Sequence, residues 1–210
     1  MSPRPPAYPV NLLLDGRPVL VVGGGGVALE KVRGLVEAGA VVTVVAPAVD
    51  PRLEDLPVTL ERRPYRSGEA ARYRLAVAAT GDPAVNQTVH DDADAAGVWV
   101  NAADDPARCS YTLPARVRRG DLLLTVSTGG SSPALAAWLR EQLEEQFGDE
   151  YAILVDVLAE ERARVQAEGS ATAGPGWRAA LQSGMLDRIR DGDVAGAREL
   201  LRTCLSSSSG

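Results

Sequence analysis

The chain has 210 residues, enough for one domain or for a domain with a smaller addition. Its 45% of hydrophobic and 24% of charged residues are typical of a soluble globular protein and exclude a chain that is disordered throughout. The formal net charge of −6 disfavours nucleic acid as a partner.

Cysteine and histidine content bounds the metal chemistry and the compartment. Two cysteines and one histidine are too few for a disulfide framework or a structural zinc site, so we expect no metal site and a reducing cytoplasm. The first ten residues contain four prolines and lack the apolar core of a signal peptide. No stretch reaches the roughly 18 consecutive apolar residues of a membrane helix. We therefore expect a cytoplasmic protein without membrane contact.

The first elements in chain order are predicted to be a strand, a tight turn and a helix. Pro18–Val22 is a short apolar, β-branched run, and four consecutive glycines follow it. Apolar side chains recur at helical spacing in residues 27–38, and Gly39 supplies a stop. A second apolar run at 41–46 completes a strand–helix–strand unit, which requires a parallel sheet and a right-handed crossover.

The following segments extend this alternation. We expect strands at 58–62, 75–79 and 98–100, and a helix at 83–96. Strands that alternate with helices predict a doubly wound, Rossmann-like α/β sheet, which we assign to residues 1–113.

Beyond the last of these strands the pattern changes from crossovers to a hairpin. Apolar runs at 111–117 and 122–126 flank a short turn and predict two antiparallel strands. Ser132 and Pro133 then provide the N-cap and the first-turn proline of a helix that runs to about Phe147.

The remainder of the chain has only helical patterns. One helix is expected at 151–166, and two or three short helices broken at glycines are expected at 177–204. We therefore divide the chain after residue 113 into a hairpin–helix segment at 114–149, a small all-helical C-terminal domain at 150–205 and a disordered tail at 206–210.

The glycine turn after the first strand predicts a dinucleotide site. Gly23, Gly25 and Ala28 form a Gly-x-Gly-x-x-Ala pattern between a strand and a helix, where small residues let the backbone approach a pyrophosphate. The helix start then presents free N–H groups and a positive dipole end to the phosphates. A plain tight turn is the alternative interpretation.

The second strand does not settle which cofactor binds. It lacks the terminal Asp or Glu that binds the adenosine ribose, and Val44-Val-Ala-Pro47 stands in that place. Asp50 lies nearby and Arg52 has the chemistry of a 2′-phosphate reader, so these residues leave NAD and NADP both open. Thr80 follows another strand at the ligand-binding edge and is expected to line the cofactor cleft, and Asp82 is suited to cap the next helix; an ordinary turn is the alternative.

A series of motifs accumulates in fixed order between residues 8 and 147. They are Tyr8-Pro-Val, Leu12 to Ala28 with Lys31, Val44-Val-Ala-Pro47, Ala78-Ala-Thr80, Val100-Asn-Ala-Ala-Asp104 and Ser127-Thr-Gly-Gly-Ser-Ser-Pro133. Together they resemble the precorrin-2 dehydrogenase family, to which the N-terminal domain of siroheme synthase belongs. Beyond residue 150 only the helical character is shared.

The resemblance implies NAD-dependent oxidation of precorrin-2 to sirohydrochlorin, in siroheme or cobalamin synthesis, by a homodimer. Segment 114–149 would then serve dimerisation and substrate contact, and Asp104 matches the catalytic aspartate. The family's use of NAD favours NAD as the cofactor here. The NAD contacts that the resemblance implies are Gly26, Val27, Pro47 and Ala48.

The expected chemistry needs a base and anion-binding groups. Asp104 is expected to take the proton that leaves while a hydride goes to the cofactor, with Asp105 in reserve; a turn-forming role is the alternative for both. Precorrin-2 is a polycarboxylate, so guanidinium and N–H donors suit it. The candidates are Arg108, Arg116, Ser127, Gly129, Gly130 and Ser132, with simple helix capping the alternative for Ser132.

Two further functions stay open. A bifunctional protein would also insert iron into sirohydrochlorin, with Asp104 serving both steps. A non-catalytic NAD-sensing module would bind the cofactor alone, but it would not require the Asp104 region and the 127–133 loop together.

Overall fold

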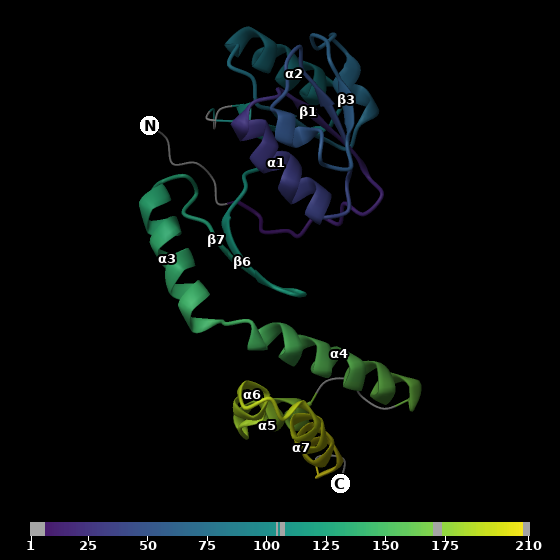
Figure 1. Cartoon of the computed structure of the whole chain (residues 1–210), viewed down its shortest axis with the longest axis vertical. Coiled ribbons are helices and arrows are strands. Elements are labelled where there is room, and N and C mark those ends of the chain that lie inside the picture. The colour runs from purple at the N-terminus through teal and green to yellow at the C-terminus, as the bar shows by residue number, and fades with distance from the viewer. Residues whose placement is uncertain (1–6, 104, 106–107, 170–173, 208–210) are drawn as a thin grey trace. The chain divides into compact units, whose positions relative to one another are not determined.

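The structure is a computed structural model that describes residues 7–103, 105, 108–169 and 174–207. It contains two compact units, Met1–Leu113 and Pro114–Gly210, whose elements are traced in Figure 1. Within the described ranges, no helix combines the length and the apolar character needed to cross a membrane.

The first unit is built on a five-stranded parallel sheet. Its strands are β1 (Pro18–Val22), β2 (Val41–Val45), β3 (Thr59–Glu61), β4 (Leu75–Ala78) and β5 (Trp99–Ala102). They lie in the order β3-β2-β1-β4-β5, and every neighbouring pair is parallel. The order reverses between β1 and β4, and such a reversal opens a ligand-binding crevice at the carboxyl ends of the strands. This confirms the predicted Rossmann-like fold.

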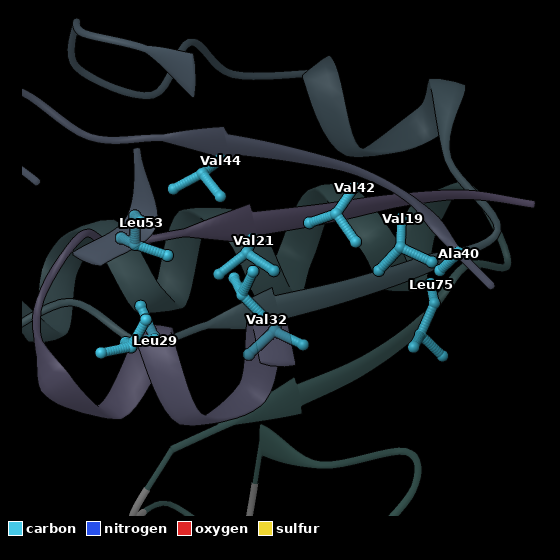
Figure 2. Packing of buried hydrophobic residues seen from close by; sticks show 11 residues of the cluster. Val19, Val21, Leu29, Val32, Ala40, Val42, Val44, Leu53 and Leu75 are labelled. Atoms are coloured by element: carbon cyan, nitrogen blue, oxygen red, sulfur yellow. The ribbon is translucent and has the colours of Figure 1, made fainter. Parts of the chain in front are cut away.

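Two helices cover the sheet, α1 (Gly26–Glu37) and α2 (Pro83–Ala95). Alternate residues of β1 belong to two different cores: Val19 and Val21 pack in the cluster that contains α1, and Leu20 and Val22 pack in the cluster that contains α2. Figure 2 shows the first of these clusters. Because both faces of β1 are buried, its sequence is a continuous apolar run instead of an alternating one.

The second unit begins with an antiparallel hairpin of β6 (Ala115–Arg119) and β7 (Leu122–Val126). The first strand starts later than the predicted run at 111–117, because Tyr111 packs against the core of the first unit. The connecting turn is also shorter than predicted. Only two residues connect the strands, and the first of them, Gly120, has a positive φ of 54°.

Helices make up the rest of the second unit. They are α3 (Pro133–Gln146), α4 (Glu150–Ala167), α5 (Pro175–Gln182), α6 (Met185–Arg190) and α7 (Val194–Ser207). The last four share one core, in which Leu154, Met185 and Leu201 are buried. Helix α7 enters the segment that was predicted as a tail, because the hydroxyls of Ser206 and Ser207 donate hydrogen bonds to the carbonyl of Thr203. The helix therefore extends to Ser207, past the predicted start of the tail at residue 206.

A carboxylate on α2 fastens the loop that precedes β4. Asp92 accepts hydrogen bonds from the Tyr65 hydroxyl at 2.8 Å, the Ser67 hydroxyl at 3.0 Å and the Gly68 N–H at 2.7 Å. Partial burial favours the neutral carboxyl, but the three donors outweigh it and hold the pKa of Asp92 below its ordinary value. Asp92 therefore stabilises the fold only while it is ionised.

The Asp92→Asn variant should lower the free energy of unfolding by about 1 kcal/mol at neutral pH, because the amide nitrogen replaces an oxygen that accepts hydrogen bonds from the loop. Urea unfolding measures this. Since the folded-state pKa is lowered, the advantage of the wild type is complete above the unfolded-chain pKa and is lost as the pH falls through the folded value. Asp94→Asn, an exposed change on the same helix, is the control. Equal stability of Asp92→Asn and wild type at pH 7 would contradict this account.

Candidate nucleotide and substrate site

Two glycines at the end of β1 are in backbone contact with neighbouring loops. A Cβ on Gly23 would lie 2.3 Å from the Ala79 carbonyl oxygen, and one on Gly24 would lie 2.2 Å from the Ala48 carbonyl oxygen. Gly23 also has a φ of 125°, which side chains rarely allow. These positions therefore need glycine for packing within the protein.

The next two glycines face open space. A Cβ on Gly25 or on Gly26 would meet no atom within 4 Å, and both residues are exposed. The turn thus has a packed half, which fixes the backbone, and an open half, which leaves room for a ligand.

Helix α1 begins in that open half without a side-chain cap. Gly25 is its N-cap residue and supplies no capping side chain, and the first turn contains no acidic residue. The first N–H groups of a helix have no partners within the helix, and together with the helix dipole they attract anions. The predicted contacts Gly26 and Val27 lie at this start and are exposed. Their backbone fits the diphosphate of a dinucleotide.

The loop after β2 lies beside the same turn. Pro47 and Ala48 are exposed there, and the N–H of Asp50 donates to the Gly24 carbonyl at 2.7 Å. Asp50 in turn forms a two-point ion pair with Arg52, with distances of 3.0 Å from Nε and 2.7 Å from Nη2. Asp50 and Arg52, the two residues that left the choice between NAD and NADP undecided in the sequence, are thus paired with each other.

The ion pair between Asp50 and Arg52 keeps the Asp50 carboxylate ionised beside the turn. Hydrogen bonds from the Arg52 side chain and from its N–H lower the pKa of Asp50 to about 2, so the carboxylate is ionised at neutral pH. The Arg52 guanidinium is already engaged by Asp50 and is less available to a ligand phosphate.

The loop after β4 contains Thr80 at the same edge of the sheet. Its side chain and its backbone are both hydrogen-bonded to Asn86, in the first turns of α2. Asp82 caps α2 through the N–H of Ala84 at 2.8 Å, with Pro83 following in the first turn, as expected. Asn86 was missed by the sequence analysis. The only signal for it was a polar residue shortly after a capping aspartate.

The loop after β5 contains the expected catalytic segment. Asp104 lies outside the described residues. The neighbouring Asp105 forms an ion pair with Arg108, whose Nε also donates to Gln87 on α2 at 2.6 Å. The Arg108 guanidinium is therefore held against its own unit, which the sequence did not indicate.

The C-terminal end of that loop is fastened to β5. The Cys109 sulfur lies 3.3 Å from the N–H of Ala102, and the N–H of Ser110 donates to the Val100 carbonyl at 2.9 Å. The buried Asn101 side chain donates to the Tyr111 carbonyl at 3.1 Å. Cys109 thus helps to hold the end of the loop against β5.

The remaining predicted substrate contacts belong to the second unit. Ser127, Gly129 and Gly130 are exposed in the turn before α3, and both glycines have positive φ. The Ser132 hydroxyl accepts the N–H of Leu135 at 3.2 Å and caps α3. Arg116 is exposed on β6.

Arg119, at the tip of the hairpin, caps the other end of α3. Its Nε donates to the Phe147 carbonyl at 2.9 Å, and its Nη2 donates to the Glu144 carbonyl at 3.3 Å. A cation is favourable at a helix C-terminus, so this arginine has a structural role.

Comparison with known proteins agrees with this geometry. Residues 10–115 match the family model described as "Putative NAD(P)-binding". The chain belongs to this NAD(P)-binding family. Residues 119–146 match a second model, described as the central part of a sirohaem biosynthesis protein. The first match covers the sheet with its glycine turn, and the second covers β7 and α3.

Relatives of known name support the same assignment. Siroheme synthase 1 of Aeromonas salmonicida is 35% identical over 96% of this chain and 45% of its own length. The siroheme synthase of Tolumonas auensis is 40% identical over 75% of this chain and 34% of its own. The chain thus spans less than half the length of these relatives.

A solved structure matches over its whole length. SirC, a precorrin-2 dehydrogenase, is 28% identical, with a TM-score of 0.72, and the match covers 95% of this chain and 100% of that one. The resemblance to the precorrin-2 dehydrogenase family that the sequence motifs indicated is therefore confirmed.

The two halves of the glycine turn should respond differently to substitution. Gly24→Ala should lower the free energy of unfolding by about 1–3 kcal/mol, because its methyl group would overlap the Ala48 carbonyl. Gly26→Ala should leave stability unchanged or slightly improved, since alanine favours a helix and meets open space. Urea unfolding of both variants measures the difference, and equal losses would show that the turn is not divided in this way.

Proposed function

We propose that the protein catalyses the NAD-dependent dehydrogenation of precorrin-2 to sirohydrochlorin. The observation that carries the proposal is the uncapped and exposed start of α1, which follows two glycines that contact the loops after β2 and β4. The name and full-length structural match of SirC support the choice of substrate. We place the reaction in siroheme or cobalamin synthesis and the protein in the cytoplasm.

The protein's part in cofactor binding follows from the turn. The N–H groups of Gly26 and Val27 hold the diphosphate, and Pro47 and Ala48 border the adenosine half. Gly25 lets the backbone come this close, and Gly23 supports the turn through its contact with Ala79. When bound, NAD⁺ supplies the acceptor for the hydride that leaves the substrate carbon.

Asp104 is the proposed base. Dehydrogenation removes a hydride and a proton from the tetrapyrrole, and the proton must go to a group on the protein or to water. The Asp104 carboxylate takes it, and Asp105 is less suited because its carboxylate is already paired with Arg108.

The substrate's carboxylates need donors. Arg116 and the N–H groups of the 127–132 turn provide them, with Gly129 and Gly130 leaving the backbone accessible. Nε of Arg108 bonds to Gln87 and Nη1 pairs with Asp105, so a substrate contact by Arg108 would use Nη2.

We also propose a homodimer that uses α3. This helix buries none of its residues fully within the chain, yet Leu135 and Trp138 are apolar and 46% and 55% exposed. Apolar exposure of this kind on a regular helix is typical of an interface. A monomer in analytical ultracentrifugation would contradict the proposal.

The direct test supplies anaerobic precorrin-2 with NAD⁺ and follows nucleotide reduction together with sirohydrochlorin absorbance. Wild type should produce both signals. Asp104→Asn should lower turnover by about two orders of magnitude or more, the contribution typical of a general base, and leave NAD⁺ affinity unchanged. Asp105→Asn is the matched control and should retain turnover. Full activity of Asp104→Asn would remove its catalytic assignment, and repeating the assay with Fe²⁺ detects chelation of the product.

The ion pair beside the glycine turn predicts how cofactor choice can be altered. Asp50→Ala should improve NADP affinity relative to NAD about five- to tenfold, because it removes a carboxylate and releases the Arg52 guanidinium toward a 2′-phosphate. The double variant with Arg52→Ala should lose this gain. Isothermal titration with both cofactors measures the ratio. If Asp50→Ala left the ratio unchanged, the pair would have no part in the choice of cofactor.

A further inference from the structure

The peptide group between Ala79 and Thr80 lies against the glycine turn, and we call it the wall. The peptide that joins Ala79 to Thr80 lies against Gly23, so that a Cβ there would be 2.3 Å from the Ala79 oxygen and 3.1 Å from the Thr80 nitrogen. The Ala79 N–H donates to the Val22 carbonyl at 2.8 Å, which fixes the start of the loop to β1. The position of this wall beyond Ala79 depends on what holds Thr80.

The side chain of Asn86 holds it at two backbone atoms. Its Oδ1 accepts the Thr80 N–H at 3.2 Å, and its Nδ2 donates to the Thr80 carbonyl at 3.0 Å. The Asn86 carboxamide therefore pairs with both the N–H and the carbonyl of Thr80, as the backbone of a neighbouring strand does in a sheet. Asn86 belongs to the rigid α2, so the loop is fixed to a helix at the point where β4 has ended.

The Thr80 hydroxyl is used within the same network. It lies 2.8 Å from Asn86 Oδ1 and 3.0 Å from the Asp82 carbonyl, and it accepts the Asp82 N–H at 3.1 Å. A hydroxyl has one proton to donate, and both nearby acceptors belong to the protein. The side chain of Thr80 thus orders the loop and does not need a ligand as its partner.

The strand order indicates which part of a dinucleotide meets this wall. In folds of this kind the adenosine ribose lies at the end of the second strand and the diphosphate at the turn after the first. Here β2 and β4 flank β1 on opposite sides. The dinucleotide must therefore continue from β1 toward β4, which places the nicotinamide riboside half at the Ala79–Thr80 peptide.

We propose that Asn86 is a positioning residue for the nicotinamide half of the cofactor, acting through the Ala79–Thr80 peptide. The proposal rests on the NAD-binding function proposed above. It assigns Asn86 no contact with the reacting atoms. Binding of the nicotinamide half should depend on Asn86, and binding of the adenosine diphosphate half should not. A general loss of stability would weaken the binding of both halves.

The experiment compares two nucleotides in isothermal titration of the full chain. For Asn86→Ala the Kd of NAD⁺ should rise about tenfold, the effect of losing one to two net hydrogen bonds, while the Kd of ADP should stay within about twofold of wild type. Thr88→Ala is the matched control, because its hydroxyl bonds only to the Ala84 carbonyl of its own helix. This control should bind both nucleotides as wild type does.

Asn86→Asp serves as a second variant in case Asn86→Ala does not fold. It keeps the acceptor for the Thr80 N–H and loses the donor to the Thr80 carbonyl, so its NAD⁺ affinity should lie between those of wild type and Asn86→Ala. In turnover assays both variants should raise KM for NAD⁺ more than they lower kcat.

Three results decide the matter. A selective loss of NAD⁺ affinity supports the assignment. Parallel loss of NAD⁺ and ADP, or no loss of either, overturns it while leaving the proposed function intact. Failure of the wild type to bind either nucleotide overturns the proposed function itself.

Discussion

Backbone contacts at Gly23 and Gly24 leave no room for a side chain between β1 and the loops on either side of it. The loop after β4 lies against the first glycine, and the loop after β2 lies against the second. Both loops are therefore drawn to the carboxyl end of the central strand, where the order of the sheet reverses. The same contacts set where α1 begins, and the first residues of this uncapped helix are exposed there. The nucleotide binding that we propose depends on this arrangement, because the attraction would come from backbone N–H groups whose position is fixed by packing.

The charges near the turn suit an anion although the chain carries a net charge of −6. The first turn of α1 has no acidic residue, and the nearby Asp50 is held in an ion pair by Arg52. Other charged side chains fasten structure instead of binding ligands: Arg119 caps α3, and Arg108 joins the loop after β5 to α2. The chain's arginines therefore cannot be counted together as one basic surface for a polycarboxylate.

Much of the first unit could be predicted from its sequence because local rules determine it. A strand buried on both faces is a continuous apolar run, and a turn without room for side chains is a run of glycines. The cap at Asp82, like that at Ser132 in the second unit, follows from residue types at helix starts. Interactions between distant segments could not be predicted in this way. The strand β6 begins late because Tyr111 packs against the first unit, and Asn86 reaches Thr80 only once α2 lies along the sheet. The catalytic role that we propose for Asp104 rests mainly on the family resemblance, because an aspartate in a turn-forming segment has no signature of its own.

The central claim is that the backbone at the start of α1 binds the cofactor's diphosphate. Amide-resolved NMR during an NAD⁺ titration tests it most directly. We expect the largest saturable shifts at the N–H groups of Gly25, Gly26 and Val27, and smaller shifts in the loops after β2 and β4. Saturable shifts that leave these three amides unchanged, or an absence of shifts at millimolar NAD⁺, would contradict it.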